Sequence, residues 1–247
     1  MVLYILGATA GLASETLQQQ AEAGHSLVLH GRNEEKLKSL QASLQDKTEV
    51  SFVVGEVEEV DLMDRMWQAG QELAGSPGHF LCFVGIPGRL APKDWSPSSL
   101  ASVFATNCSG PLLACRRWAQ LMMLEGLQAN AVLLSTMQAQ YPFEGSLPYS
   151  LGKVALEHGL RLLAKEYAPA LRINGIAPGV NEAGMALASI QRGKYQPYVD
   201  SGVIPRFGQP SDLAHAVNFL LQDELYMTGE TLLLDGGFTL RRDQHRL

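Results

Sequence analysis

The chain opens with the stretch Val2-Leu3-Tyr4-Ile5-Leu6-Gly7-Ala8-Thr9-Ala10-Gly11-Leu12-Ala13, and this stretch decides the fold. Residues 2–6 form a continuous apolar run, which is typical of a strand buried on both faces. Two glycines, Gly7 and Gly11, then bracket a turn that leads into a helix predicted to end near Ala23. Glycine lets the backbone approach a pyrophosphate, which then meets the positive end of the following helix. The stretch therefore predicts a dinucleotide-binding turn, although such a turn can also simply connect a strand to a helix.

Further apolar runs alternate with helical patterns along the rest of the chain. Strands are predicted at residues 27–29, 50–54, 80–84, 131–134, 171–176 and 231–234. Helices are predicted over residues 34–44, with Asn33 as the cap, over 62–73, over 99–124, and from Tyr149 to about residue 167. This alternation implies right-handed crossovers and an open parallel sheet covered on both faces. The predicted fold class is α/β, a single Rossmann-type doubly wound parallel sheet of about seven strands, in one domain over residues 1–247.

The composition disfavours several classes of function. The formal net charge is -6 and no basic run is longer than Arg241-Arg242, which argues against nucleic-acid binding. No apolar run approaches the roughly 20 residues that span a bilayer. Cys82, Cys108 and Cys115 show no metal-ligand spacing, so we expect inert thiols and no metal site. Met1 leads directly into the first strand without a signal-peptide pattern, and we expect a cytoplasmic protein.

Several small or polar residues follow directly after predicted strands. In open parallel sheets, ligands bind beyond the carboxyl ends of the strands, near the point where the strand order reverses. The residues in such positions are Gly7, Arg32, Glu56, Gly85, Thr136 and Pro178-Gly179. We therefore expect them to gather at one edge of the sheet and to form the ligand site.

Tyr149 and Lys153 are four residues apart, which places them on one face of a helix. A phenol normally titrates near pH 10, and an ammonium one turn away favours the phenolate and lowers the pKa toward neutrality. A hydroxyl upstream, on Thr136 or Ser135, would hold a carbonyl oxygen beside the phenol. The pair suits proton transfer to a carbonyl, but it is also the common arrangement of a half-buried tyrosine beside a solvated lysine.

Arg32 ends the second predicted strand, where the adenosine ribose of a dinucleotide would lie. An acidic residue there bonds the 2′-hydroxyl of NAD, whereas an arginine suits the 2′-phosphate of NADP. Residues 31–33 contain no acid. The sequence therefore favours NADP(H), the alternative being a surface arginine paired with Glu34 or Glu35.

Together these motifs resemble the short-chain dehydrogenase/reductase family over essentially the whole chain. They occur in the family's order and spacing as Gly7-x-x-x-Gly11, Asn107, Thr136, Tyr149-x-x-x-Lys153, Pro178-Gly179 and Leu234-Asp235-Gly236-Gly237. The resemblance implies hydride transfer between a nicotinamide cofactor and the carbonyl or alcohol of a small molecule. It also implies a homotetramer or homodimer, built through the long helices that begin near Ser99 and Pro148 and through the C-terminal strand.

The resemblance also assigns roles to residues of this chain. Tyr149 would donate a proton to the carbonyl oxygen, which Thr136 holds, while Lys153 lowers the pKa of the phenol and binds the nicotinamide ribose. Asn107 would bind a water through its backbone and pass protons to Lys153. The expected cofactor-binding residues are Gly7, Thr9, Ala10, Gly11, Leu12, Arg32, Glu56, Val57, Gly85, Lys153, Pro178 and Gly179. Residues 181–205 would form a flap over the substrate.

The chain also departs from the family pattern. Cys82-Phe83-Val84-Gly85 stands where the family has Asn-Asn-Ala-Gly, Leu6 replaces a threonine, and Ala183 falls where a threonine usually bonds the cofactor. These losses leave open a second function, a cofactor-binding regulatory or scaffold subunit with little turnover. The segments 168–172 and 237–241 are similar to those of pteridine reductases, which suggests a third, although the arginine of that branch is absent from the glycine turn.

Overall fold

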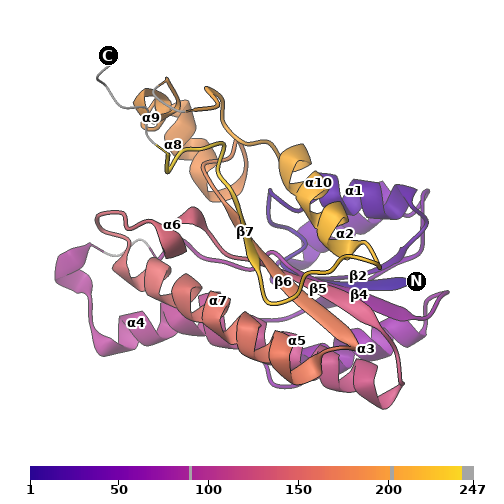
Figure 1. Ribbon diagram of the computed structural model, residues 1–247. Coiled ribbons are helices and arrows are strands. Elements are labelled where there is room, and N and C mark those ends of the chain that lie inside the picture. Colours follow the sequence, from indigo (N-terminus) through magenta and orange to yellow (C-terminus); the bar gives the residue numbers. More distant parts are fainter. Residues whose placement is uncertain (89–90, 201–202, 241–247) are drawn as a thin grey trace.

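The computed structural model describes residues 1–88, 91–200 and 203–240. Its centre is one sheet of seven strands in the order β3-β2-β1-β4-β5-β6-β7, and every neighbouring pair is parallel. The strands are β1 Val2–Leu6, β2 Ser26–Gly31, β3 Val50–Val54, β4 Pro77–Cys82, β5 Ala129–Leu134, β6 Leu171–Pro178 and β7 Thr231–Leu234. The order reverses between β1 and β4, so the predicted doubly wound α/β fold is confirmed (Figure 1).

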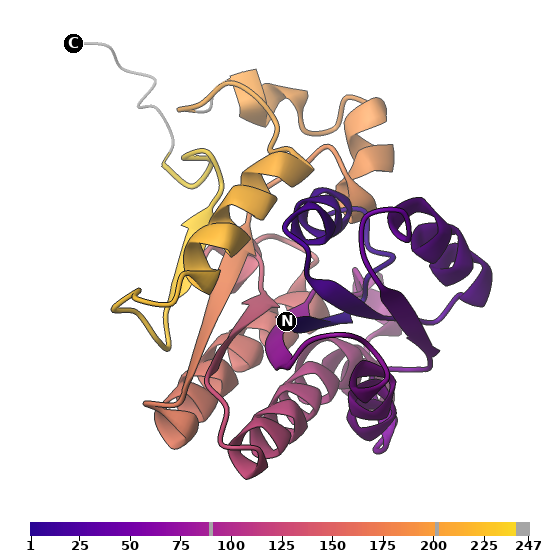
Figure 2. The same cartoon turned by 90° about the vertical axis from the view of Figure 1, so that its right-hand side faces the viewer.

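Helices cover both faces of the sheet, as Figures 1 and 2 show. One layer contains α1 Ser14–Glu22, α2 Glu34–Leu44 and α10 Pro210–Leu221, and the other contains α3 Leu62–Gln71, α4 Pro97–Phe104, α5 Gly110–Leu124 and α7 Leu147–Tyr167. Short helical segments complete the chain: η1 Pro92–Asp94, η2 Ala105–Ser109, α6 Met137–Gln140, η3 Gly184–Ala186, α8 Leu187–Gln191 and α9 Gln196–Asp200. The prediction of a single domain is not tested by this arrangement and stays a prediction.

The apolar runs of the strands bury side chains on both faces because successive residues point to opposite sides. In β1, Tyr4 joins the core cluster that includes Trp118 of α5, whereas Ile5 joins the cluster that includes Leu17 of α1. The sheet therefore separates two hydrophobic cores. This explains why β1 reads as a continuous apolar run rather than an alternating one.

Three differences from the sequence-based prediction concern element boundaries. The helix predicted over residues 99–124 is divided by the π-turn η2, in which the N–H of Gly110 donates to the carbonyl of Ala105. No helix was predicted over α10, although its buried residues Leu213, Val217 and Leu220 have helical spacing. Strand β4 ends at Cys82 rather than two residues later. By contrast, Asn33 caps α2 as predicted, since its side chain accepts a hydrogen bond from the N–H of Lys36 at 2.8 Å.

Two expected absences can be compared only with the described ranges. Within residues 1–88, 91–200 and 203–240, no helix has the length and apolar character required to cross a bilayer. Among the same residues, no cluster of three His, Cys, Asp or Glu side chains could hold a metal ion.

Candidate active site

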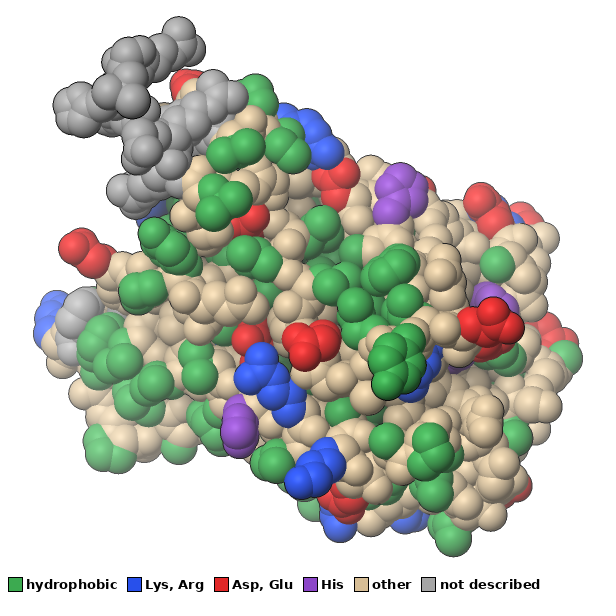
Figure 3. Space-filling view, viewed as in Figure 1, with side chains coloured by type: hydrophobic (Ala, Val, Ile, Leu, Met, Phe, Trp, Pro, Cys, Tyr) green, Lys and Arg blue, Asp and Glu red, His purple; other side chains and the backbone are tan. Residues whose placement is uncertain are grey.

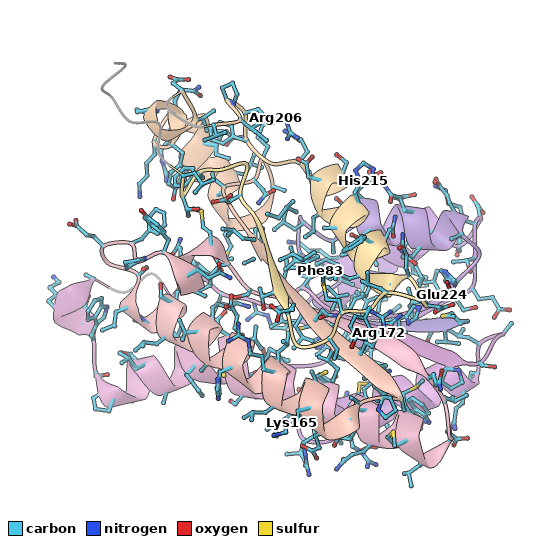
Figure 4. All side chains as sticks on the ribbon, viewed as in Figure 1. Phe83, Lys165, Arg172, Arg206, His215 and Glu224 are labelled. Atoms are coloured by element: carbon cyan, nitrogen blue, oxygen red, sulfur yellow. The ribbon has the colours of Figure 1, made fainter. Side chains whose placement is uncertain are left out.

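A cavity of about 590 Å³ opens at the carboxyl edge of the sheet, where ligands bind in folds of this type. Its walls are formed by the glycine turn, by the ends of β4, β5 and β6, by helix α7 and by residues 180–186 after β6. Phe83, which follows β4, lies in the interior of the molecule and forms part of the cavity wall. Arg206 and Lys165 lie at the periphery of the molecule (Figure 4). Ten of the residues predicted for the site line this cavity: Thr9, Ala10, Gly11, Leu12, Gly85, Thr136, Tyr149, Lys153, Pro178 and Gly179.

The remaining predicted residues lie outside the cavity wall. Gly7 precedes it and has a φ of +72°, and a Cβ there would lie 2.9 Å from the backbone nitrogen of Val84. Arg32 and Glu56 are exposed at the ends of β2 and β3, and their side chains are 3.8 Å apart. Val57 is buried against the start of α5, where a Cβ on Gly110 would meet its carbonyl oxygen at 2.9 Å.

Tyr149 and Thr136 are brought together by α7 and by the end of β5. Thr136 caps the short helix α6, where its hydroxyl accepts from the N–H of Gln138 at 3.3 Å. The same hydroxyl is close enough to the phenol of Tyr149 to lower the pKa of that group. The neighbouring hydroxyl of Ser135 points elsewhere and donates to Glu157 at 2.6 Å. Of the two hydroxyls, Thr136, to which the family resemblance assigned the role, is the one on the cavity wall beside the phenol.

Lys153 lies one helical turn after Tyr149 on α7, and only 2% of its surface is exposed. Its ammonium donates to the carbonyl of Leu134 at 2.8 Å and to that of Val84 at 3.1 Å, and so ties α7 to the ends of β5 and β4. Burial lowers the pKa of Lys153 to about 8. The alternative interpretation of the pair, a half-buried tyrosine beside a solvated lysine, is thus wrong for the lysine.

The expected lowering of the Tyr149 pKa by Lys153 is not found. Burial raises the pKa of Tyr149, and the hydrogen bond from Thr136 opposes this only in part. The physical reason is that desolvation penalises the phenolate, while the ammonium of Lys153 is directed to two backbone carbonyls. The phenol in this structure therefore retains its proton at neutral pH.

Asn107 lies in the π-turn η2 and is fully buried. Its amide nitrogen donates to the carbonyls of Val103 and Ile86 at 3.0 Å each, and its oxygen accepts from the N–H of Ile86 at 2.9 Å. The side chain thus ties the helix to the loop after β4, where the family asparagines are missing. A Cβ on Gly85 would lie 3.3 Å from the Asn107 oxygen and 3.6 Å from the Lys153 nitrogen, so these three residues are close neighbours. The role of Asn107 in proton passage stays a prediction.

Ala183 and Gly184, in the segment predicted to form a flap, lie against the glycine turn. A Cβ on Gly11 would lie only 2.7 Å from the backbone nitrogen of Gly184, and Gly184 has a φ of +57°. This close contact was not predicted, and neither were the cavity-lining residues Gln138 and Ser146. The glycine content of the flap was the available signal, but its partner on the turn lies about 170 residues earlier in the chain.

The three thiols have no evident part in the site. Cys82, Cys108 and Cys115 are free and buried, and burial raises the pKa of all three, that of Cys108 to about 11. Since the thiolate is the reactive form, these cysteines have the character of inert core residues.

The chain belongs to the short-chain dehydrogenase/reductase family. The family model described as enoyl-(acyl carrier protein) reductase matches residues 7–239. The protein is thus a member of a family of oxidoreductases that use nicotinamide cofactors and act on small molecules.

Among characterised relatives, glucose 1-dehydrogenase of Gluconobacter oxydans is 28% identical over 98% of this chain and 92% of its own length. Carbonyl reductase family member 4 of Danio rerio is 27% identical over 96% of this chain and 97% of its own. Among solved structures, a short-chain type dehydrogenase/reductase from Mycobacterium ulcerans has a TM-score of 0.89 at 23% identity, covering 98% of this chain and 90% of that one. A variant of actinorhodin polyketide ketoreductase, solved with NADPH, has a TM-score of 0.88 at 22% identity and covers 96% of each chain. The two solved structures support the fold alone.

Proposed function

We propose that the protein reduces the carbonyl group of a small organic ketone or aldehyde with NADPH. The observation that carries the proposal is the placement of Thr136 and Tyr149 together on the wall of a 590 Å³ cavity that is also lined by the glycine turn and Lys153. A hydroxyl and a protonated phenol side by side suit one acceptor, the oxygen of a carbonyl group.

The residues around the cavity fit a dinucleotide. Within the described chain, the backbone N–H groups of Gly11 and Leu12 have no protein acceptor, and they precede helix α1 at the cavity wall. Free N–H groups at a helix N-terminus suit a pyrophosphate. Lys153, Gly85 and Pro178-Gly179 would surround the nicotinamide half, and when bound this group supplies the hydride that reaches the carbonyl carbon.

The preference for NADPH rests on Arg32. Its guanidinium is exposed at the end of β2, and Glu34 and Glu35 pair with Lys38 instead. The 3.8 Å separation from Glu56 is long for an ion pair, and both side chains are more than half exposed, so the pair contributes little. Arg32 is thus available to a 2′-phosphate, and Glu56 with Val57 lies where the adenine would be.

The side chains of the protein would act on the substrate in a simple order. Thr136 donates a hydrogen bond to the carbonyl oxygen and Tyr149 transfers its phenolic proton to the same atom. The raised pKa of Tyr149 keeps that proton in place until the oxygen gains negative charge. The ammonium of Lys153, one helical turn away, then favours the phenolate that remains.

The test is Tyr149→Phe, with Tyr141→Phe as the matched control because Tyr141 is exposed and outside the cavity wall. We expect Tyr149→Phe to abolish NADPH oxidation over a panel of ketones and aldehydes while NADPH affinity changes less than about threefold. Tyr141→Phe should behave as the parent protein. Equal turnover in Tyr149→Phe and the parent would refute the role of the phenol.

The second candidate is a cofactor-binding subunit without turnover, which the missing asparagine segment at residues 82–85 favours. Tight NADPH binding without oxidation on any carbonyl of the panel would support it. Clear turnover by the parent protein would exclude it. No observation at the site favours a pteridine substrate over other carbonyl compounds.

We also propose assembly into a homodimer or homotetramer through α4, α5 and α7 and through β7. Helix α7 exposes Leu151, Val154 and Leu162 along one side, and Leu233 of β7 is 42% exposed. Figure 3 shows apolar side chains gathered on the face that carries β7 and α10. Light scattering after size exclusion would test this assembly, and a monomer at micromolar concentration would contradict it. A cytoplasmic location stays a prediction, which cell fractionation would test.

A further inference from the structure

Glu157 is a buried carboxylate that the proposed proton transfer does not use. It lies on α7, one helical turn beyond Lys153, and only 9% of its surface is exposed. The hydroxyl of Ser135 donates to its Oε1 at 2.6 Å. A carboxylate inside a hydrophobic layer is costly, and an apolar residue at this position would avoid that cost.

Three successive turns of α7 contact three successive residues at the end of β5. Tyr149 lies beside Thr136 on the cavity wall, and Lys153 donates to the carbonyl of Leu134. In the third contact, Glu157 accepts from the residue between them. The acidic residue thus closes a row of contacts that fixes the rotation and the height of the helix on the strand.

The surroundings of Lys153 give the carboxylate a second effect. Burial is the main cause that lowers the pKa of Lys153, and it is opposed, in decreasing order, by Cys82 at the end of β4, Cys108 in η2 and Glu157 of α7. Burial raises the pKa of both thiols, so they are neutral at pH 7. Glu157 is the acidic residue among these three groups and lies one helical turn from Lys153, so its charge opposes the desolvation of the ammonium.

We propose that Glu157 is a positioning residue of the site, which anchors α7 through Ser135 and holds Lys153 in its ammonium form. The inference rests on the proposed reductase function for its catalytic meaning, but the link between Glu157 and Lys153 can be measured without turnover. The alternative is that Glu157 serves only as the hydrogen-bond acceptor for the hydroxyl of Ser135. The two interpretations differ in whether the negative charge of Glu157 affects the titration of Lys153.

Glu157→Gln separates the two interpretations, because the amide oxygen can still accept from Ser135 while the negative charge is lost. The control is Glu166→Gln, an exposed glutamate farther along the same helix. The measurement is the pH titration of the Lys153 side chain by ¹³C NMR of lysine-labelled protein, with the signal assigned by Lys153→Arg. We expect Glu157→Gln to lower the midpoint by ~1 pH unit and Glu166→Gln to leave it unchanged.

The pH profile of kcat/KM gives the second readout. Since loss of the ammonium removes support for the phenolate, the alkaline limb should move to lower pH in Glu157→Gln by the same amount as the NMR midpoint. An unchanged NMR midpoint in folded Glu157→Gln would overturn the proposal. A shifted midpoint in a protein that turns over no carbonyl would retain the Glu157–Lys153 link and refute the proposed function.

A double variant keeps the proposal falsifiable if Glu157→Gln does not fold. Glu157→Met with Ser135→Ala replaces both partners by apolar groups, a change that is often nearly neutral for stability. The same fall in the Lys153 midpoint is expected, and its absence would overturn the proposal.

Discussion

Substitution of Gly7 by alanine tests how tightly the glycine turn is built into the fold. Gly7 has a φ of +72°, and an added Cβ would lie 2.9 Å from the backbone nitrogen of Val84 and 3.1 Å from the backbone carbonyl carbon of Phe83. Gly126, after α5, is the matched control, because its φ is +66° and a Cβ there meets no atom within 4 Å.

The two substitutions share one cost and differ in another. The left-handed backbone costs a residue with a Cβ ~1–2 kcal/mol, and this applies to both positions. The change in the unfolded chain is also the same and cancels in the comparison. Only Gly7→Ala places a Cβ against the backbone of Phe83 and Val84, directly after β4, and forces that backbone to move. Such overpacking costs ~1–3 kcal/mol. We therefore expect Gly7→Ala to be less stable than Gly126→Ala by ~1–3 kcal/mol.

Urea denaturation followed by far-UV circular dichroism measures this difference, with tryptophan fluorescence as the second probe. An NADPH titration of both variants adds a functional readout, because only the Gly7 variant displaces the turn next to the cavity. Equal free energies of unfolding for the two variants would refute the reasoning, since the contact with Val84 would then carry no energetic weight.

Three further predictions concern the site and its supports. Arg32→Asp should raise the Kd for NADPH roughly 10–100-fold and that for NADH less than about threefold, because a charge-assisted contact to the 2′-phosphate is lost. Fluorescence titration measures both Kd values, and an unchanged preference for NADPH over NADH would contradict this role of Arg32. Burial lowers the pKa of Lys153 from its ordinary value of 10.5 to about 8. Between these two pH values the unfolded chain therefore binds more protons than the folded protein does. The parent protein should thus gain up to ~3 kcal/mol of stability over that window relative to Lys153→Met, and urea midpoints that shift in parallel would contradict this. Asn107→Ala removes three hydrogen bonds from a buried position and should cost ~2–4 kcal/mol in the same assay, with a loss below ~1 kcal/mol counting against the anchoring role.

The parts of the fold that follow from short stretches of sequence were predictable. The buried strand β1, the glycine turn and the cap at Asn33 depend on residues within a few positions of one another. The position of residues 136, 149 and 153 around one cavity also followed, because the carboxyl ends of parallel strands meet at one edge of the sheet. Helix α10 carried a helical apolar pattern as well, although no helix was predicted there.

Other features depend on partners that no local pattern names. The contact of Gly11 with Gly184 joins distant segments, and the π-turn that carries Asn107 is fixed by bonds to the loop after β4. The family spacing already assigned Thr136, but only the structure shows the physical reason, which is that Glu157, 22 residues after Ser135, accepts from the hydroxyl of Ser135.

The sequence by itself determined the order of strands and helices, the glycine turn and the identity of the groups that can exchange a proton. Only the tertiary structure decided the state of those groups: Tyr149 has a raised pKa rather than a lowered one, and Lys153 is enclosed rather than solvated. The physical reason is that secondary structure follows from spacing along the chain, whereas the cost of a charge depends on how much water the whole fold removes from it.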